Sequence, residues 1–211
     1  MSAPATTLRV ALSMRVMRWP ENGEAFDGIS HDWIVRLGSW GWTPLLVPNG
    51  VGDGPAYLDA FAADVLLLTG GDDLGRMPDR DRMERSLLEH ALSTGLPVFG
   101  VCRGLQLIND RFGGRLTPIP GHVATSHAVA VSEPAAAVYG PRLTVNSFHA
   151  LGIRPDGLGR GLEPFARDED GWIEGVRLPD RPLAAVMWHP ERLDAPAGDR
   201  AMIAAVAAAR P

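Results

Sequence analysis

The sequence predicts an α/β fold, with a mostly parallel central sheet flanked by helices on both faces and short additional strands in the second half. In the first half, apolar runs of strand type alternate with segments of helical periodicity. A turn bounded by Gly100 and Gly104 joins one such run directly to a helix, and after Arg115 the pattern changes to short strands and turns. Strands that alternate with helices favour parallel pairing. With 211 residues, 45% of them hydrophobic, the chain suits one domain over residues 1–211.

Apolar runs bounded by turn residues mark the expected strands. Those of the first half are residues 7–13, 43–47, 64–69 and 96–101. Those of the second half are residues 116–119, 127–131, 142–146, 172–177 and 183–188. Residues 14–23, which follow the first strand, are expected to form a loop.

Helices are expected where apolar residues recur every three or four positions. One apolar face is formed by Ile29, Trp33, Leu37 and Trp40. A second helix is expected over residues 80–94, where Gly95 ends it, and a third runs from Cys102 to Gly113-Gly114. The alanine-rich residues 199–209 are predicted to form a closing helix.

The segment Gly100-Val-Cys102-Arg-Gly104 has the pattern of a nucleophile elbow, with cysteine as the nucleophile. Small residues flank the nucleophile because the strand-to-helix bend is tight and a Cβ would crowd it. The helix N-terminus that follows favours a thiolate. Cys102 is the only cysteine, which excludes a disulfide within the chain and a cysteine-only metal site. The alternative is a small buried hydrophobic residue.

The segment His189-Pro-Glu191 directly follows a predicted buried strand. In extended backbone, residues i and i+2 point to the same side, so Glu191 can reach one imidazole nitrogen of His189. The other nitrogen is then free to face a nearby thiol. Taken alone, this segment is typical of a turn, but together with the elbow it predicts a Cys102–His189–Glu191 triad.

Three predicted strands end in residues with catalytic character. Gly70-Gly71, Cys102 and His189 all lie at strand carboxyl ends. In an open parallel sheet, ligands bind beyond these ends. We therefore expect one site that combines all three. The amide of Arg103, next to the thiol, is a natural donor to an oxyanion there.

These motifs resemble the class I glutamine amidotransferase superfamily. Thr69-Gly-Gly-Asp-Asp73, Val145-Asn-Ser-Phe-His149 and Asp170-Gly-Trp-Ile-Glu174 narrow the resemblance to its γ-glutamyl hydrolase branch, which includes γ-glutamyl-γ-aminobutyrate hydrolases. The resemblance implies hydrolysis of a γ-glutamyl amide through a γ-glutamyl thioester. It also implies that Gly71 is the second oxyanion donor, beside Arg103.

The resemblance further places four residues at the substrate. These are Gln106, Ser147, His149 and Glu174. Alternatives stay open: Gln106 as a solvated helix residue, His149 as a second catalytic histidine, and Glu174 as support for its loop. His127 is expected to pack behind the site, whereas His31, His90 and His122 are expected at the surface.

Arg15 closes the first predicted strand and so faces the same crevice. A guanidinium offers a planar fork that matches carboxylate or phosphate oxygens. We therefore expect Arg15 to bind an anionic or nucleotide-linked amine, as in a biosynthetic deprotection step. Arg18, in the same segment, is expected to be solvated.

Composition excludes several classes of function. The net charge of −5 and pI near 5.6 argue against nucleic-acid binding. Every basic residue is arginine, which removes lysine Schiff bases and a lysine-bearing P-loop. No metal or other cofactor is expected, since Asp72 and Asp73 point apart and have no ligand cluster.

The first seven residues do not resemble a signal peptide and no run is long enough to span a membrane, so the expected location is cytoplasmic. The partner is then a small molecule, and a homodimer stays open.

Two other functions compete with the hydrolase. A glutaminase subunit that supplies ammonia to a separate synthetase would use the same triad. A catalytically silent binding or regulatory relative would be expected to have lost Cys102 or His189, and both are present. The segments that end in His149 and Glu174 favour the hydrolase.

Overall fold

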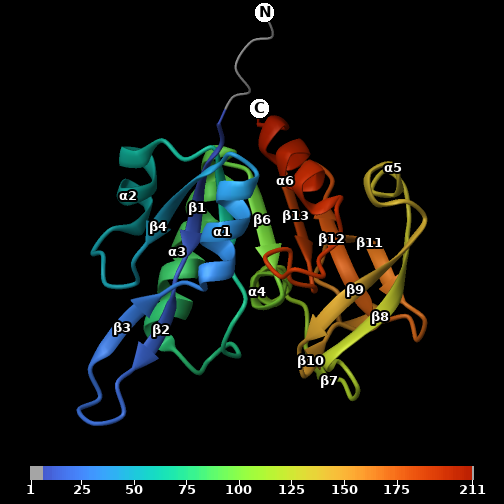
Figure 1. The fold of residues 1–211 in the computed structure, drawn as a ribbon, viewed down its shortest axis with the longest axis horizontal. Helices are drawn as coiled ribbons and strands as arrows, with labels where there is room; N and C mark the ends of the chain where they lie inside the picture. The colour runs from blue at the N-terminus through green and yellow to red at the C-terminus, as the bar shows by residue number, and fades with distance from the viewer. Residues whose placement is uncertain (1–6, 211) are drawn as a thin grey trace, which may run out of the picture.

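A single nine-stranded sheet runs through the molecule (Figure 1). The computed structural model describes residues 7–210, so the predicted lack of a signal peptide lies largely outside the described residues. Five strands at one end of the sheet are parallel: β4 (Thr43–Val47), β1 (Arg9–Ser13), β5 (Val65–Leu68), β6 (Val98–Val101) and β13 (Leu183–Val186). The remaining four continue it antiparallel: β12 (Ile173–Leu178), β11 (Glu163–Asp168), β8 (Val123–Val131) and β9 (Arg142–Phe148).

Helices cover both faces of the parallel part, as predicted. One apolar cluster joins that sheet to α1 (His31–Ser39) and α6 (Asp199–Ala208). The opposite cluster joins it to α2 (Gly54–Phe61), α3 (Pro78–Thr94) and α4 (Arg103–Arg111). Alternate residues of one strand supply the two clusters, as when Leu67 faces the first and Leu66 the second. The shorter elements are α5 (Ala136–Tyr139) and the 3-10 turn Pro155–Gly157.

The prediction of a loop at residues 14–23 is wrong, because part of this segment forms a strand. Arg15 begins a strand of its own, because the chain forms a hairpin of β2 (Arg15–Arg18) and β3 (Ala25–Gly28). This hairpin projects beyond the carboxyl end of β1, at the lower left of Figure 1. Asp27 ties it to the rest of the molecule by accepting hydrogen bonds from the Asn49 amide at 2.7 Å and side chain at 2.6 Å.

Two further elements escaped prediction for identifiable reasons. The strand β11 reads Glu-Pro-Phe-Ala-Arg-Asp, in which charges and a proline hide the apolar alternation. The helix α2 begins inside a glycine- and proline-rich segment, where Asp53 caps it by accepting from the Ala56 amide. The short strands β7 (Thr117–Pro118) and β10 (Leu151–Gly152) form a separate pair. Within residues 7–210, none of the helices has the length and apolar character needed to cross a membrane.

Candidate active site

Cys102 forms the bend between β6 and α4. Its backbone has φ 51° and ψ −104°, a strained conformation for a residue with a Cβ. The Cys102 amide donates to the Val186 carbonyl of the neighbouring β13 at 2.8 Å, which anchors the bend to the sheet. Gly104 is required because a Cβ there would overlap the Leu68 carbonyl oxygen. The predicted elbow is therefore present, and it holds the thiol at the carboxyl edge of the parallel strands.

His189 follows β13 and is oriented from two sides. Its Nδ1 lies 2.8 Å from Glu191 Oε1, as the i, i+2 spacing predicted. The side chain of Asn146 fixes the His189 backbone by accepting from its amide at 2.9 Å and donating to its carbonyl at 3.2 Å. Among the described residues, Nε2 of His189 has no hydrogen-bond partner. The imidazole is thus fixed through one nitrogen and free at the other.

The three strand ends converge, as expected. A Cβ added to Gly70 would lie 2.8 Å from His189 Cε1 and 3.5 Å from the Cβ of Cys102. These residues line a pocket of about 320 Å³ together with Gly71, Glu191, Phe148 and Arg192. The N-terminus of α1 closes another side of this pocket through Ser30 and Trp33. We call this space the cysteine pocket.

The electrostatics of the cysteine pocket favour a charged imidazole. Burial lowers the pKa of His189, but the neighbouring Cys102 and Glu191 raise it by more, to about 10. A positive imidazole beside the thiol stabilises a thiolate by charge attraction. The site therefore holds a positive imidazole close to the Cys102 sulfur at neutral pH.

The predicted oxyanion donors belong to segments that share one ion network. Arg80 is fully buried and donates to the carbonyls of Thr69 and Gly70 at 2.9 and 3.0 Å, just before Gly71. Its Nε donates to Glu84 at 2.9 Å, and Glu84 also pairs with Arg103 at the start of α4. Burial and a neighbouring arginine lower the pKa of each guanidinium to about 10, so both stay charged at neutral pH.

Gly71 lies in the left-handed region, with φ 138°. A Cβ there would lie 2.5 Å from Arg80 NH1 and 2.8 Å from Arg15 Nε, so only glycine fits between the two guanidiniums. The oxyanion roles of Gly71 and Arg103 stay predictions.

The rim of the cysteine pocket carries two arginines. Arg15 lines it, as expected, and its NH2 lies 3.6 Å from Asp72 Oδ2. Arg192, which sequence reasoning missed, stacks with its Cζ 4.0 Å from the centre of the Phe148 ring. Phe148 in turn lies edge-on to the His189 imidazole, with ring centres 5.7 Å apart.

The four residues predicted at the substrate do not line the cysteine pocket. Gln106, Ser147, His149 and Glu174 are all buried. Gln106 Nε2 donates to the Leu151 carbonyl at 3.1 Å, and Ser147 Oγ donates to the His122 carbonyl at 2.7 Å. Phe148, between Ser147 and His149, faces the pocket instead. Direct contact of these four with substrate stays a prediction.

Two histidines that were expected at the surface are more buried than predicted. The prediction of a surface position for His122 is wrong, since it is buried with Nε2 3.2 Å from Asp168 Oδ2. His90, likewise expected at the surface, is partly buried, and its Nε2 lies 2.8 Å from Asp59 Oδ1.

Burial raises the pKa of Glu174, but the imidazoles of His127 and His149 lower it by more, so the carboxylate is charged.

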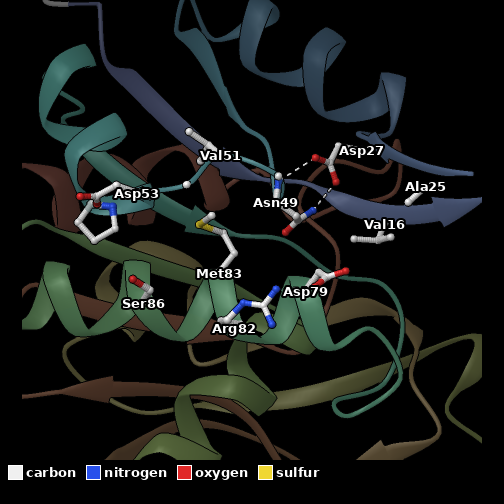
Figure 2. A pocket seen from close by; sticks show the side chains of 14 residues that line it. Val16, Ala25, Asp27, Asn49, Val51, Asp53, Asp79, Arg82, Met83 and Ser86 are labelled. Carbon is white, nitrogen blue, oxygen red and sulfur yellow. Dashed lines mark hydrogen bonds and ion pairs between the residues drawn. The ribbon is translucent and has the colours of Figure 1, made fainter.

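A larger pocket of about 710 Å³ lies on the other side of the hairpin (Figure 2). Val16 of β2 faces it, whereas the preceding Arg15 faces the cysteine pocket. Asp27, Asp53, Asp79 and Arg82 supply its charged groups. None of the residues that line it is a cysteine or histidine, whereas Cys102 and His189 line the smaller pocket.

The chain is similar in sequence to several known proteins. The family model for peptidase C26 matches residues 10–191. The glutamine amidotransferase-like protein YvdE of Lactococcus lactis is 35% identical over 157 residues, which cover 61% of this chain and 66% of that protein. The gamma-glutamyl-gamma-aminobutyrate hydrolase PuuD of Escherichia coli is 31% identical over 207 residues, 80% of each chain.

A third relative is named for a different substrate. The gamma-glutamyl-CDP-amidate hydrolase of Campylobacter jejuni is 29% identical over 133 residues, covering 60% of this chain and 62% of that protein. The matches with this protein and with YvdE thus span less than two thirds of either relative's length.

A crystal structure from Thermoplasma acidophilum, described as that of a GMP synthase component, matches the fold. It has a TM-score of 0.74 at 21% identity, with 97% of this chain and 96% of that one covered. The predicted α/β fold is therefore confirmed.

Proposed function

This chain belongs to the peptidase C26 family, and from that premise we propose that it hydrolyses a γ-glutamyl amide to glutamate and an amine. The observation that carries the proposal is the cysteine pocket, in which Cys102, His189 and Glu191 meet at adjacent strand ends. The family match and two relatives with hydrolase names support the same chemistry. The reaction needs no cofactor.

Acylation begins with Cys102 as thiolate and His189 as imidazolium. The sulfur attacks the γ-carbonyl carbon, and the carbonyl electrons move to oxygen. The tetrahedral intermediate collapses as the C–N bond breaks, and His189 gives its proton to the departing amine nitrogen. Glu191 keeps the imidazole oriented and stabilises its charge. The product of this half is a γ-glutamyl thioester on Cys102.

Deacylation reverses the role of the imidazole. Neutral His189 accepts a proton from water as the water oxygen attacks the thioester carbonyl. Glutamate leaves, and the thiolate–imidazolium pair is restored. In both halves the developing oxyanion takes hydrogen bonds from the amides of Gly71 and Arg103. Arg80 and Glu84 act as positioning residues, because they hold the two segments that carry these amides.

The amine side of the substrate is proposed to carry an anionic group. Arg15 and Arg192 lie at the rim of the cysteine pocket, where the leaving amine would extend. One relative is named for a CDP-amidate, a nucleotide-linked group, which is compatible with this charge preference. The single thiol, used as a nucleophile, suits a reducing compartment such as the cytoplasm.

A glutaminase that supplies ammonia to a synthetase is the second candidate, supported by the amidotransferase-like relatives. The two differ in what lies beyond the scissile nitrogen: the hydrolase gains binding energy from a bulky amine, whereas free glutamine offers only ammonia. The test compares kcat/KM of the purified protein alone on a γ-glutamyl secondary amide and on glutamine. We expect a preference for the secondary amide of at least about tenfold. Glutamine as the better substrate, with activity that requires an added second protein, would overturn the hydrolase proposal.

A further inference from the structure

A second cluster of ionisable side chains is buried in the antiparallel part of the molecule. It joins His122, just before β8, His127 on β8, and Glu174 on β12. One potential ligand atom from each of these residues lies within 4.8 Å of the other two. His149, at the end of β9, adds a third imidazole, with its ring centre 5.2 Å from that of His122. We call these four residues the histidine cluster.

The cluster contains polar atoms that the protein leaves unsatisfied. Within residues 7–210, no hydrogen bond is made by either carboxylate oxygen of Glu174, by either ring nitrogen of His127, or by Nε2 of His149. Glu174 is 1% exposed, so bulk solvent does not reach its carboxylate oxygens. Leaving buried polar atoms unpaired is costly, and such a concentration of them calls for a missing partner.

Backbone carbonyls hold two of the imidazoles through Nδ1. Nδ1 of His149 lies 3.0 Å from the Leu151 carbonyl, and Nδ1 of His122 lies 3.1 Å from the Pro120 carbonyl. A carbonyl only accepts, so each Nδ1 carries the proton. Nε2 of His149 then faces Glu174, whereas Nε2 of His122 lies 3.2 Å from Asp168 Oδ2. Histidines that bind metal commonly have this arrangement, with the far nitrogen donating to a backbone carbonyl.

The spacing of the inward-facing atoms fits a small metal ion. Glu174 Oε2 lies 3.6 Å from His127 Nε2, and Glu174 Oε1 lies 3.5 Å from His149 Nε2. These distances are long for direct charged hydrogen bonds, which measure about 2.7–2.9 Å. They are close to the edge of a tetrahedron with metal–ligand bonds of ~2.0–2.1 Å, which is about 3.4 Å. Each of the two separations therefore has the length expected of a pair of ligands that share one cation.

We propose that His122, His127 and Glu174 bind a divalent transition-metal ion of the zinc class, with His149, whose Nε2 lies 3.5 Å from Glu174 Oε1, as a fourth donor. Imidazole nitrogens with one carboxylate select such ions over magnesium or calcium, which prefer oxygen ligands. Binding replaces the contact between His122 and Asp168. This site is separate from the cysteine pocket, whose lining contains none of the four residues.

The role of this ion is structural. Glu174 and His149 are buried, and the members of the cluster come from β8, β12 and the segments next to β8 and β9. A bound ion would cross-link these strands directly behind Phe148, the residue of β9 that faces the cysteine pocket. Metal binding would thus stabilise the wall that carries Phe148 without entering the reaction.

The experiment measures zinc binding in a background that lacks the competing thiol. In Cys102→Ala, stripped of metal with a chelator, added zinc should bind at about one ion per chain and raise Tm by roughly 8–16 °C at a free concentration of 1,000 times Kd. Magnesium should do neither. His127→Gln and Glu174→Gln in that background should weaken zinc binding by at least about 100-fold. The matched control is His90→Gln, which removes a histidine–carboxylate pair elsewhere and should bind zinc normally.

Cobalt provides a readout that does not depend on these variants folding. Cobalt bound to the otherwise unmodified chain with Cys102→Ala should give the visible bands of a tetrahedral nitrogen–oxygen site. Absence of both zinc binding and a zinc-dependent change in Tm would overturn the proposal. Zinc binding that survives both His127→Gln and Glu174→Gln, or a preference for magnesium, would overturn it as well.

Discussion

Two groups of histidine and glutamate in this protein use the same side chains in opposite ways. At the edge of the parallel strands, His189 and Glu191 form one bond of 2.8 Å, and the imidazole faces the cysteine pocket. In the antiparallel strands, Glu174 is sealed between His127 and His149 at 3.6 and 3.5 Å, without a hydrogen bond to either. Spacing, rather than residue type, separates the two groups.

The difference follows from how each group is built. His189 and Glu191 are two residues apart beyond one strand, so the backbone alone brings them together. A single short bond leaves the second nitrogen of His189 free to exchange protons. The histidine cluster is collected from separate strands, and Glu174 lies 3.6 and 3.5 Å from the Nε2 atoms of His127 and His149. The first geometry suits proton transfer, and the second suits a bound cation.

The largest expected effect is a loss of kcat on substitution of His189, which separates the catalytic group from the histidine cluster. His189→Gln should lower kcat by roughly 10²–10⁴-fold, because it removes the proton donor and acceptor of both half-reactions. Glu174→Gln should act first on stability, lowering the free energy of unfolding by about 3–5 kcal/mol, as expected when one partner of a buried charged group is lost. Steady-state kinetics and denaturant unfolding of both variants check this. The opposite result would contradict these roles: His189→Gln would mainly lower the free energy of unfolding, and Glu174→Gln would mainly lower kcat.

A second effect concerns pH. Cys102 and Glu191 raise the pKa of His189 from its usual 6.5 to about 10 against the effect of burial. The stability contributed by the imidazolium is therefore complete below about pH 6.5 and lost as pH rises through about 10. The acylation rate should fall over the same alkaline limb, since the proton donor disappears.

Glu191→Gln removes one of the charges that raise this pKa. Its kcat should drop by about 100-fold, and the alkaline limb of its pH–rate profile should move to lower pH. The profile of kcat/KM for wild type and variant provides the measurement. An alkaline limb that does not move would mean that Glu191 does not govern the charge of His189.

A smaller loss of kcat/KM is expected on substitution of Arg15, at the rim of the cysteine pocket. Arg15→Met keeps much of the packing of the side chain but removes its charge. It should lower kcat/KM on an amide with an anionic amine by one to two decades, about the 1.5–3 kcal/mol of a charged hydrogen bond. A neutral γ-glutamyl anilide serves as the internal control and should react almost as with wild type. Equal losses on both substrates would remove Arg15 from the amine site.

The smallest effect concerns the support of His189. Asn146→Ala removes the two hydrogen bonds to the His189 backbone, at 2.9 and 3.2 Å. Looser positioning should lower kcat by about tenfold with little change in KM. The position of the alkaline limb should stay the same, since Glu191 is untouched. A loss of stability with unchanged kcat would give Asn146 a purely structural role.

The core of the cysteine pocket was predictable from sequence for a physical reason. Gly70, Cys102 and His189 each follow a short apolar strand, and in a parallel sheet such strand ends share one edge. Ser147 and His149 are two positions apart, so extended backbone puts their side chains on the same side. Periodicity does not say which face meets the pocket, and there the residue between them, Phe148, faces it.

The rim and the histidine cluster were not predictable because tertiary packing assembles them. Arg192 acquires its place by stacking on Phe148, 44 positions earlier in the chain. The members of the histidine cluster are spread from His122 to Glu174, without the short ligand spacing that marks a metal motif. The expectation of no metal rested on the single cysteine and on Asp72 and Asp73, which are neighbours in sequence.

The central claim is that Cys102 carries the glutamyl group during turnover. Its most direct test is rapid mixing with a γ-glutamyl amide, acid quenching and mass spectrometry of the peptide that contains Cys102. The account predicts one glutamyl group, attached to Cys102 and released by hydroxylamine as a thioester would be, and neither adduct nor turnover in Cys102→Ala. A glutamyl group on another residue, or turnover that persists in Cys102→Ala, would contradict it.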